Sequence, residues 1–159
     1  MGCLRNLIAF PAGLLAMGVS VATLEMLSQS IFPKSPEMKS AIEAYVRDPK
    51  SADAVEAVRL AIPTMPPAAY YALFAGWTLG ALVGGYVAGR VATSARSLFG
   101  FLMAFAGLAA IKTNLDAIPH PEWMSMQALH LLPFIAAVGG ALVARTQATR
   151  ASATKTTDR

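Results

Sequence analysis

The residues in this sequence best suited to chemistry are polar side chains embedded in long apolar stretches. Six of them lie at or near one depth in three different stretches: Glu25, Lys112, Asn114, Asp116, Gln127 and His130. Glu25, Lys112 and His130 are each six residues from one end of their stretch, roughly 9 Å along a helix. Ionisable groups inside a membrane are costly and usually face a bundle interior. The sequence therefore predicts an outward-opening polar pocket, with Glu25 as a proton or cation site.

The same side chains also have a purely structural interpretation. Glu25 and Lys112 could neutralise each other, or Lys112 could reach Asp116 or the membrane surface instead. His130 could be a hydrogen-bonded core histidine. A metal site that also used His120 would lack any fixed ligand spacing, so we predict no metal and no cofactor. Walker, Rossmann, Gly-x-Ser-x-Gly, His-Glu-x-x-His and Cys-x-x-Cys motifs are absent, so no catalytic residue is assigned and an enzyme gains no support.

Four apolar stretches must position these groups. Hydrophobic residues make up 55% of the 159 residues and charged residues only 14%, whereas soluble domains carry about 25% charged residues. A span needs about 20 apolar residues, and four stretches qualify: 7–31, 70–91, 98–118 and 124–144. The first is too long for the apolar region of a signal peptide. We predict an all-α, four-helix membrane bundle over residues 1–145 and a disordered tail over 146–159.

The distribution of charge predicts the orientation of the bundle. One side carries seven basic residues against the single acid Asp158: Arg5, Arg90, Arg96, Arg145, Arg150, Lys155 and Arg159. The other side carries five basic and six acidic residues. Lys and Arg concentrate in cytoplasmic flanks, so both termini are expected in the cytoplasm. The net charge of +4 is explained by topology, and we expect no nucleic-acid partner.

The segment 32–69, on the outer side, is rich in proline and contains two helical patterns. Ser35, Pro36 and Glu37 have the order typical of a helix start, and a second helix is expected from Ser51 to just before Pro63. Both patterns are amphipathic, so these helices could lie on the membrane surface, form a lid over the bundle, or simply make a compact packed connector. Tyr70, Tyr71 and Trp123 are expected in the aromatic belts at the membrane surface.

Small residues repeat every fourth position in the second stretch. Gly76, Gly80 and Gly84 follow this spacing, with Gly85 in a neighbouring row. Such rows allow another helix backbone to approach closely in lipid. Gly140 continues a similar row in the fourth stretch, which makes that stretch a suitable packing partner for the second. The spacing leaves open whether the partner helix belongs to the same chain.

Three strings resemble a group of small bacterial four-span membrane proteins. These strings are 22–27 running into Ile31-Phe32-Pro33, Gly76-Trp77-x-x-Gly80-x-x-x-Gly84-Gly85, and Ile118-Pro119-His120-Pro121-x-Trp123. The resemblance covers residues 7–144. It implies a location in the bacterial cytoplasmic membrane, and it implies no activity.

Two functions follow from these patterns. The first is an accessory component of a membrane assembly, which would use the glycine row to pack on other membrane proteins or on a second copy of itself. The alternative is a small transporter or ligand-binding protein that uses the polar pocket. In both, the lipid bilayer is the surrounding partner.

Overall fold

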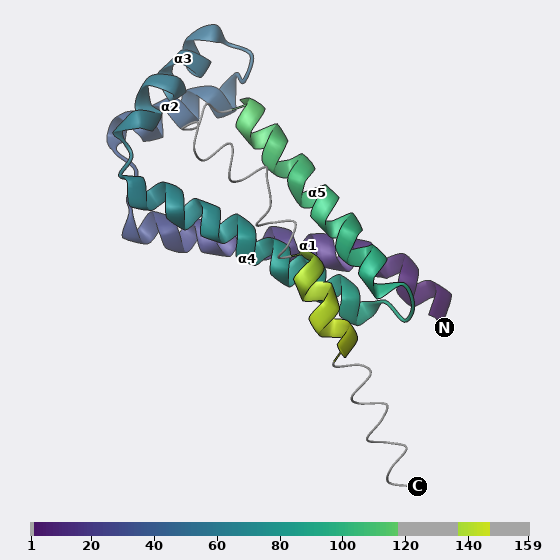
Figure 1. Ribbon diagram of the computed structural model, residues 1–159. Coiled ribbons are helices and arrows are strands. Elements are labelled where there is room, and N and C mark those ends of the chain that lie inside the picture. Colours follow the sequence, from purple (N-terminus) through teal and green to yellow (C-terminus); the bar gives the residue numbers. More distant parts are fainter. Residues whose placement is uncertain (1, 118–136, 147–159) are drawn as a thin grey trace, which may run out of the picture.

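The computed structural model describes residues 2–117 and 137–146, and every element in these ranges is helical (Figure 1). The three long helices are α1 (Gly2–Ile31), α4 (Pro67–Val91) and α5 (Arg96–Ala117). The stretches Cys3–Ile31, Pro67–Val91 and Arg96–Asp116 within them are long and apolar enough to cross a membrane. For the described residues, the prediction of helices with apolar stretches long enough to cross a membrane is therefore confirmed, and three such helices are present.

The fourth expected span, 124–144, lies mostly outside the described residues. Residues 137–146 are helical, and they include only the last part of that span. The four-span count therefore stays a prediction, and so does the prediction for the tail, of which only residue 146 is described.

Helices α1 and α4 lie antiparallel and side by side (Figure 1). At the start of α1, Arg5 Nε donates a hydrogen bond to the carbonyl oxygen of Val91, at the end of α4, over 3.2 Å. The Asn6 side chain accepts from the backbone N–H of Thr93 at 2.9 Å and donates to Ser94 Oγ at 2.7 Å. These bonds hold the short connection between α4 and α5. We call this end of the molecule the arginine end.

Three short helices cover the opposite end of α4: α2 (Pro36–Arg47), α3 (Ala52–Ala61) and the 3₁₀ helix η1 (Ile62–Thr64). We call residues 36–64 the cap. The hydroxyls of Ser35 and Ser51 accept hydrogen bonds from the backbone N–H groups of Met38 and Ala54, which satisfies donors that a helix start leaves unpaired. The two helices expected in this segment are thus present.

The cap is joined to the long helices by an apolar core. Met38 and Val58 of the cap belong to one buried cluster with Trp77 of α4 and Ile111 of α5. Tyr70, expected in an aromatic belt, is instead only 6% exposed in the same cluster. Its hydroxyl donates a hydrogen bond to the carbonyl oxygen of Ile62. A buried hydroxyl needs such a partner, so Tyr70 ties α4 to the cap.

The glycine row of α4 is occupied by helices of the same chain. A Cβ at Gly80 would collide with Val21 of α1, and one at Gly84 would lie 2.8 Å from Met17 Cβ. The neighbouring row packs elsewhere, because a Cβ at Gly85 would collide with the carbonyl group of Ala137. The helix 137–146 therefore packs against the row of α4 that contains Gly85, whereas α1 packs against the row that contains Gly80.

Two further glycines follow this division. A Cβ at Gly76 would stand 3.4 Å from Leu24 Cβ, an ordinary contact. A Cβ at Gly140 would collide with the backbone of α4 at Leu82 and Tyr86. Small residues thus bring three helices close together through dispersion contacts, which drive helix association in lipid.

The outer surfaces of α1 and α5 are apolar. Large exposed side chains on these helices include Leu7, Leu15, Met26, Leu27, Leu98 and Phe105. In water such a surface would favour aggregation, whereas in a bilayer it is the expected contact with lipid.

Candidate functional site

Glu25 lies on the face of α1 that packs against α4. Gly13 and Met17 on this face are buried, and Val21 is half-buried. Positions four apart share a helix face, so Glu25 continues the row by one turn. Its side chain is half-buried. The only acidic residue of α1 therefore points towards the neighbouring helices and away from the apolar surface.

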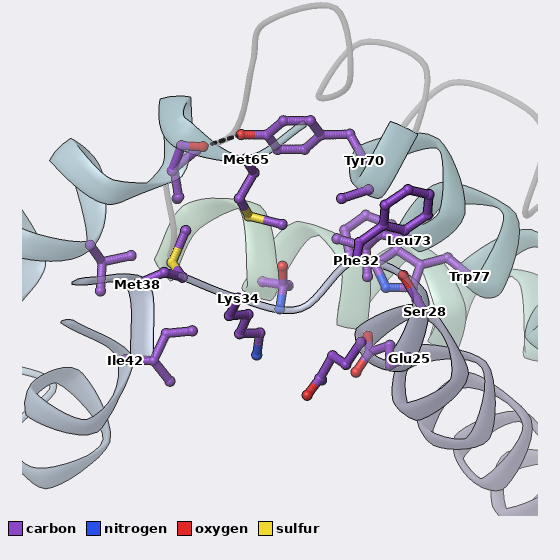
Figure 2. Close-up of a pocket in the computed structure, with 15 residues that line it drawn as sticks. Glu25, Ser28, Phe32, Lys34, Met38, Ile42, Met65, Tyr70, Leu73 and Trp77 are labelled. Carbon is purple, nitrogen blue, oxygen red and sulfur yellow. Dashed lines mark hydrogen bonds between the residues drawn. The ribbon is translucent and has the colours of Figure 1, made fainter. Parts of the chain in front are cut away.

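A cavity of about 210 Å³ lies between the cap and the long helices. Figure 2 shows Glu25 and Ser28 of α1 together with Leu73 and Trp77 of α4 on one side of it, and Met38 and Ile42 of the cap on the other. Most of its lining is apolar side chains of the cap and α4, and Lys34 lies in the connection from α1 to the cap. The cavity thus has an apolar wall with a few polar groups, as small-molecule sites usually do.

A second cavity of about 300 Å³ lies deeper among α1, α4 and α5. It shares Glu25, Trp77 and Asn114 with the first cavity. Its other lining residues are small or apolar: Met17, Gly18, Val21, Ala22, Ala81, Gly107, Ala110 and Ile111. Among the described residues that line it, Glu25 is the only one with a charge.

Within the described part of the chain, Glu25 makes no hydrogen bond and no ion pair. Lys34 is a lining residue of the first cavity but not of the second. A carboxylate among apolar helices is stabilised by a proton, a cation or a hydrogen-bond donor. The electrostatics of this site therefore favour a positively charged occupant.

Lys112 and Asp116 form an ion pair with each other, with Lys112 Nζ 2.8 Å from Asp116 Oδ2. Their side chains are 65% and 63% exposed, and neither is among the lining residues of the two cavities. The physical reason is helix geometry, because a step of two residues turns the side chain by about 200°. Asn114 therefore lies on the opposite side of α5 from the pair.

The structure thus brings together two of the six polar residues singled out in the sequence, Glu25 and Asn114. Gln127 and His130 lie outside the described residues. Within the described ranges, no group of three or more His, Cys, Asp or Glu side chains is arranged to hold a metal ion.

Sequence reasoning missed Trp77 and Lys34 as parts of this site. Trp77 is 7% exposed and lines both cavities. A usable signal was present, because Trp77 lies four and eight residues before Ala81 and Gly85 and so shares a helix face with this row of small residues. Lys34 carried no such signal, since its position depends on how the cap folds back over the bundle.

These features define a small helical protein with three helices that could cross a membrane and with a carboxylate in the wall of a largely apolar pocket. No family model, no curated protein and no solved structure matches the chain.

Proposed function

We propose that this protein is a four-span membrane protein that binds a small lipophilic cation in the two cavities beside Glu25, either as a transporter or as a ligand-binding protein. The observation that carries the proposal is the position of Glu25. It lies on the packing face of α1, without a partner in the described residues, where two cavities meet.

The lining of the cavities supports an organic ligand over a bare metal ion. Trp77 offers an aromatic face, which attracts cations, and Asn114 offers an amide. The remaining wall is apolar. Volumes of about 210 and 300 Å³ lie near the lower end of typical ligand pockets. An amine or onium group with an apolar body matches this combination.

The use of the glycine rows also favours a pocket-based function. Gly80 and Gly84 pack on α1, and Gly85 packs on the helix 137–146. Both small-residue rows of α4 are therefore covered by helices of the same chain, and neither is left for a helix of another protein.

The membrane placement is part of the proposal. Residues 124–144 form the fourth span, both termini lie in the cytoplasm, and the cap faces the opposite side of a bacterial cytoplasmic membrane. Support comes from the resemblance described above and from the arginines of the described chain, because Arg5 and Arg96 lie at one end and the cap at the other.

The fluorescence of Trp77 gives a direct test. The chain has two tryptophans, so Trp123→Phe leaves Trp77 as the only one. The purified variant in a neutral detergent is titrated with tetraphenylphosphonium, and we expect the ligand to quench the fluorescence. Adding Glu25→Gln should weaken binding about ten-fold or more, because a charged partner of a buried group is lost.

Glu43→Gln is the matched control, since Glu43 is an exposed acid on the cap helix α2. It should leave the affinity unchanged. Equal affinity in the parent, Glu25→Gln and Glu43→Gln proteins would disprove the cation site at Glu25.

A second candidate is the accessory function, in which the protein joins a larger membrane assembly or forms a homo-oligomer. The cap favours it, because Leu60 is 68% exposed and lines an open groove between α2 and α3. Co-purification from native membranes tests this function. A stoichiometric partner that is lost in Leu60→Lys and kept in Glu25→Gln would favour it over the pocket.

A further inference from the structure

A third cavity, which is polar, lies at the arginine end, far from Glu25. It has a volume of about 380 Å³ and is lined by Thr93, Ser94, Ala95, Arg96, Ser97 and Arg145. Two of these residues carry a guanidinium group, three carry a hydroxyl group, and none is acidic. The chemistry of this lining suits an oxyanion.

Within the described residues, the charged side chains at the arginine end are all basic. Arg5 and Arg90 also lie at this end, where Arg5 Nη2 donates to the carbonyl oxygen of Arg90 over 3.4 Å. Acidic residues of the described chain lie on the cap, in the cap-side half of α1 and near the end of α5. No carboxylate of the described residues therefore lies at the arginine end.

The cavity is held in shape by the start of α1. Asn6 binds Thr93 and Ser94 through three hydrogen bonds to its side chain, from Thr93 N, Thr93 Oγ1 and Ser94 N, and donates a fourth to Ser94 Oγ. Arg96 Nε donates to the carbonyl oxygen of Ala92 at 3.0 Å, which orients the guanidinium group. A loop held in this way loses little further freedom when a ligand binds.

We propose that this cavity binds the phosphate of an anionic phospholipid headgroup. Guanidinium groups match phosphate oxygens with paired, charge-assisted hydrogen bonds. The cavity lies at the ends of three candidate spans, α1, α4 and α5, which is the depth of the headgroups in a bilayer. A lipid bound there would bridge α5 and the helix 137–146 through Arg96 and Arg145. This site is separate from the pocket at Glu25 and does not depend on the function proposed for that pocket.

Native mass spectrometry of the whole protein in a neutral detergent tests the site. Phosphatidylglycerol and phosphatidylcholine are titrated separately, and we expect tighter binding of phosphatidylglycerol. Each arginine near an anionic lipid changes affinity about five-fold, so the double variant Arg96→Gln/Arg145→Gln should bind phosphatidylglycerol about 30-fold more weakly.

Two further variants keep the result interpretable. Arg96→Lys/Arg145→Lys keeps both charges and the fold, and it should bind with intermediate affinity because the planar fork is lost. Arg47→Gln/Arg59→Gln removes two exposed charges from the cap and should bind like the parent.

Two results would overturn the proposal. One is equal binding of phosphatidylglycerol by the parent and Arg96→Gln/Arg145→Gln, and the other is equal binding of the two lipids by the parent. In the last experiment, inorganic phosphate is added as a competitor of the bound lipid. If millimolar phosphate displaces the lipid from the parent, the cavity binds soluble phosphate, which would overturn the lipid headgroup as its source.

Discussion

Glu25 of α1 and Trp77 of α4 line the same two cavities, one beneath the cap and one deeper among the long helices. They meet because α1 and α4 pack antiparallel through rows of small residues, which places the cap-side turns of both helices together. A carboxylate and an indole ring at this junction are the groups on which we expect ligand binding to depend.

We expect the aromatic ring of Trp77, rather than its bulk alone, to contribute to binding of a lipophilic cation. Trp77→Phe keeps a smaller ring, whereas Trp77→Leu keeps only an apolar side chain. Loss of a cation–π contact of about 1 kcal/mol corresponds to roughly five-fold weaker binding in Trp77→Leu. Isothermal titration calorimetry with tetraphenylphosphonium measures the difference, and identical affinities for the two variants would exclude an aromatic contribution.

The ion pair of Lys112 and Asp116 should be dispensable for that binding. The pair is exposed and lines neither cavity, and exposed pairs contribute only about 0–1 kcal/mol. We expect Lys112→Gln to bind the same cation as tightly as the parent in the same calorimetric assay. A ten-fold loss would place Lys112 in the site, contrary to the structure.

Two helical glycines should respond oppositely to the same substitution. At Gly85 a Cβ would collide with the carbonyl group of Ala137, whereas at Gly18 nothing lies within 4 Å. Gly85→Ala should therefore destabilise the protein by about 1–3 kcal/mol through overpacking. Gly18→Ala should be neutral or stabilising by up to about 1 kcal/mol, because alanine favours helix more than glycine.

The unfolding of both variants is followed in detergent by circular dichroism. Gly18→Ala serves as the control for a change of helix propensity alone. Equal stabilities of the two variants would contradict the close contact between α4 and the helix 137–146.

Tyr70→Phe should loosen the cap. The Tyr70 hydroxyl donates to the carbonyl oxygen of Ile62 inside the core, and a buried hydrogen bond contributes about 0.5–1.5 kcal/mol. Hydrogen exchange of α3 and η1 should be faster in this variant. Tyr45→Phe is the control, since Tyr45 packs on the same core and no hydrogen bond of its hydroxyl occurs among the described residues. Unchanged exchange in Tyr70→Phe would contradict the tie.

The start of α2 should lose stability in acid. The pKa of Glu37 is lowered, chiefly by a hydrogen bond with its own backbone N–H and further by the Ser35 hydroxyl. Because the pKa in the folded state is below that in the unfolded state, this contribution is present above the unfolded pKa. It is lost as the pH falls through the folded pKa.

Hydrogen exchange of the α2 amides across the acidic range measures this loss. In Glu37→Gln the acid-dependent increase in exchange should shrink, whereas Glu43→Gln on the same helix should retain it. An unchanged acid response in Glu37→Gln would show that the carboxylate does not stabilise this helix start.

The local pattern of the chain was sufficient to predict the helices. Ser35 and Ser51 precede helices, as their capping preference indicates, and the three apolar stretches that the structure describes are continuous helices. These features depend on residues within one or two turns of each other, so they could be found in the sequence. The polar character of the pocket at Glu25 was also visible, because a charged residue in an apolar stretch is conspicuous.

The partners of each side chain were decided only by tertiary structure. The sequence left Lys112 free to pair with Glu25 or with Asp116, and the rotation of α5 against α1 selects Asp116. Tyr70 was equally suited to a membrane surface or a core, and the folding of the cap over α4 buries it. The repeat of Gly80 and Gly85 indicated close helix contact, but which helix fills each row depends on the shapes of all three helices together. The periodicity of the sequence determines which residues share a helix face. Only the packing of the helices against each other determines which side chains each residue contacts.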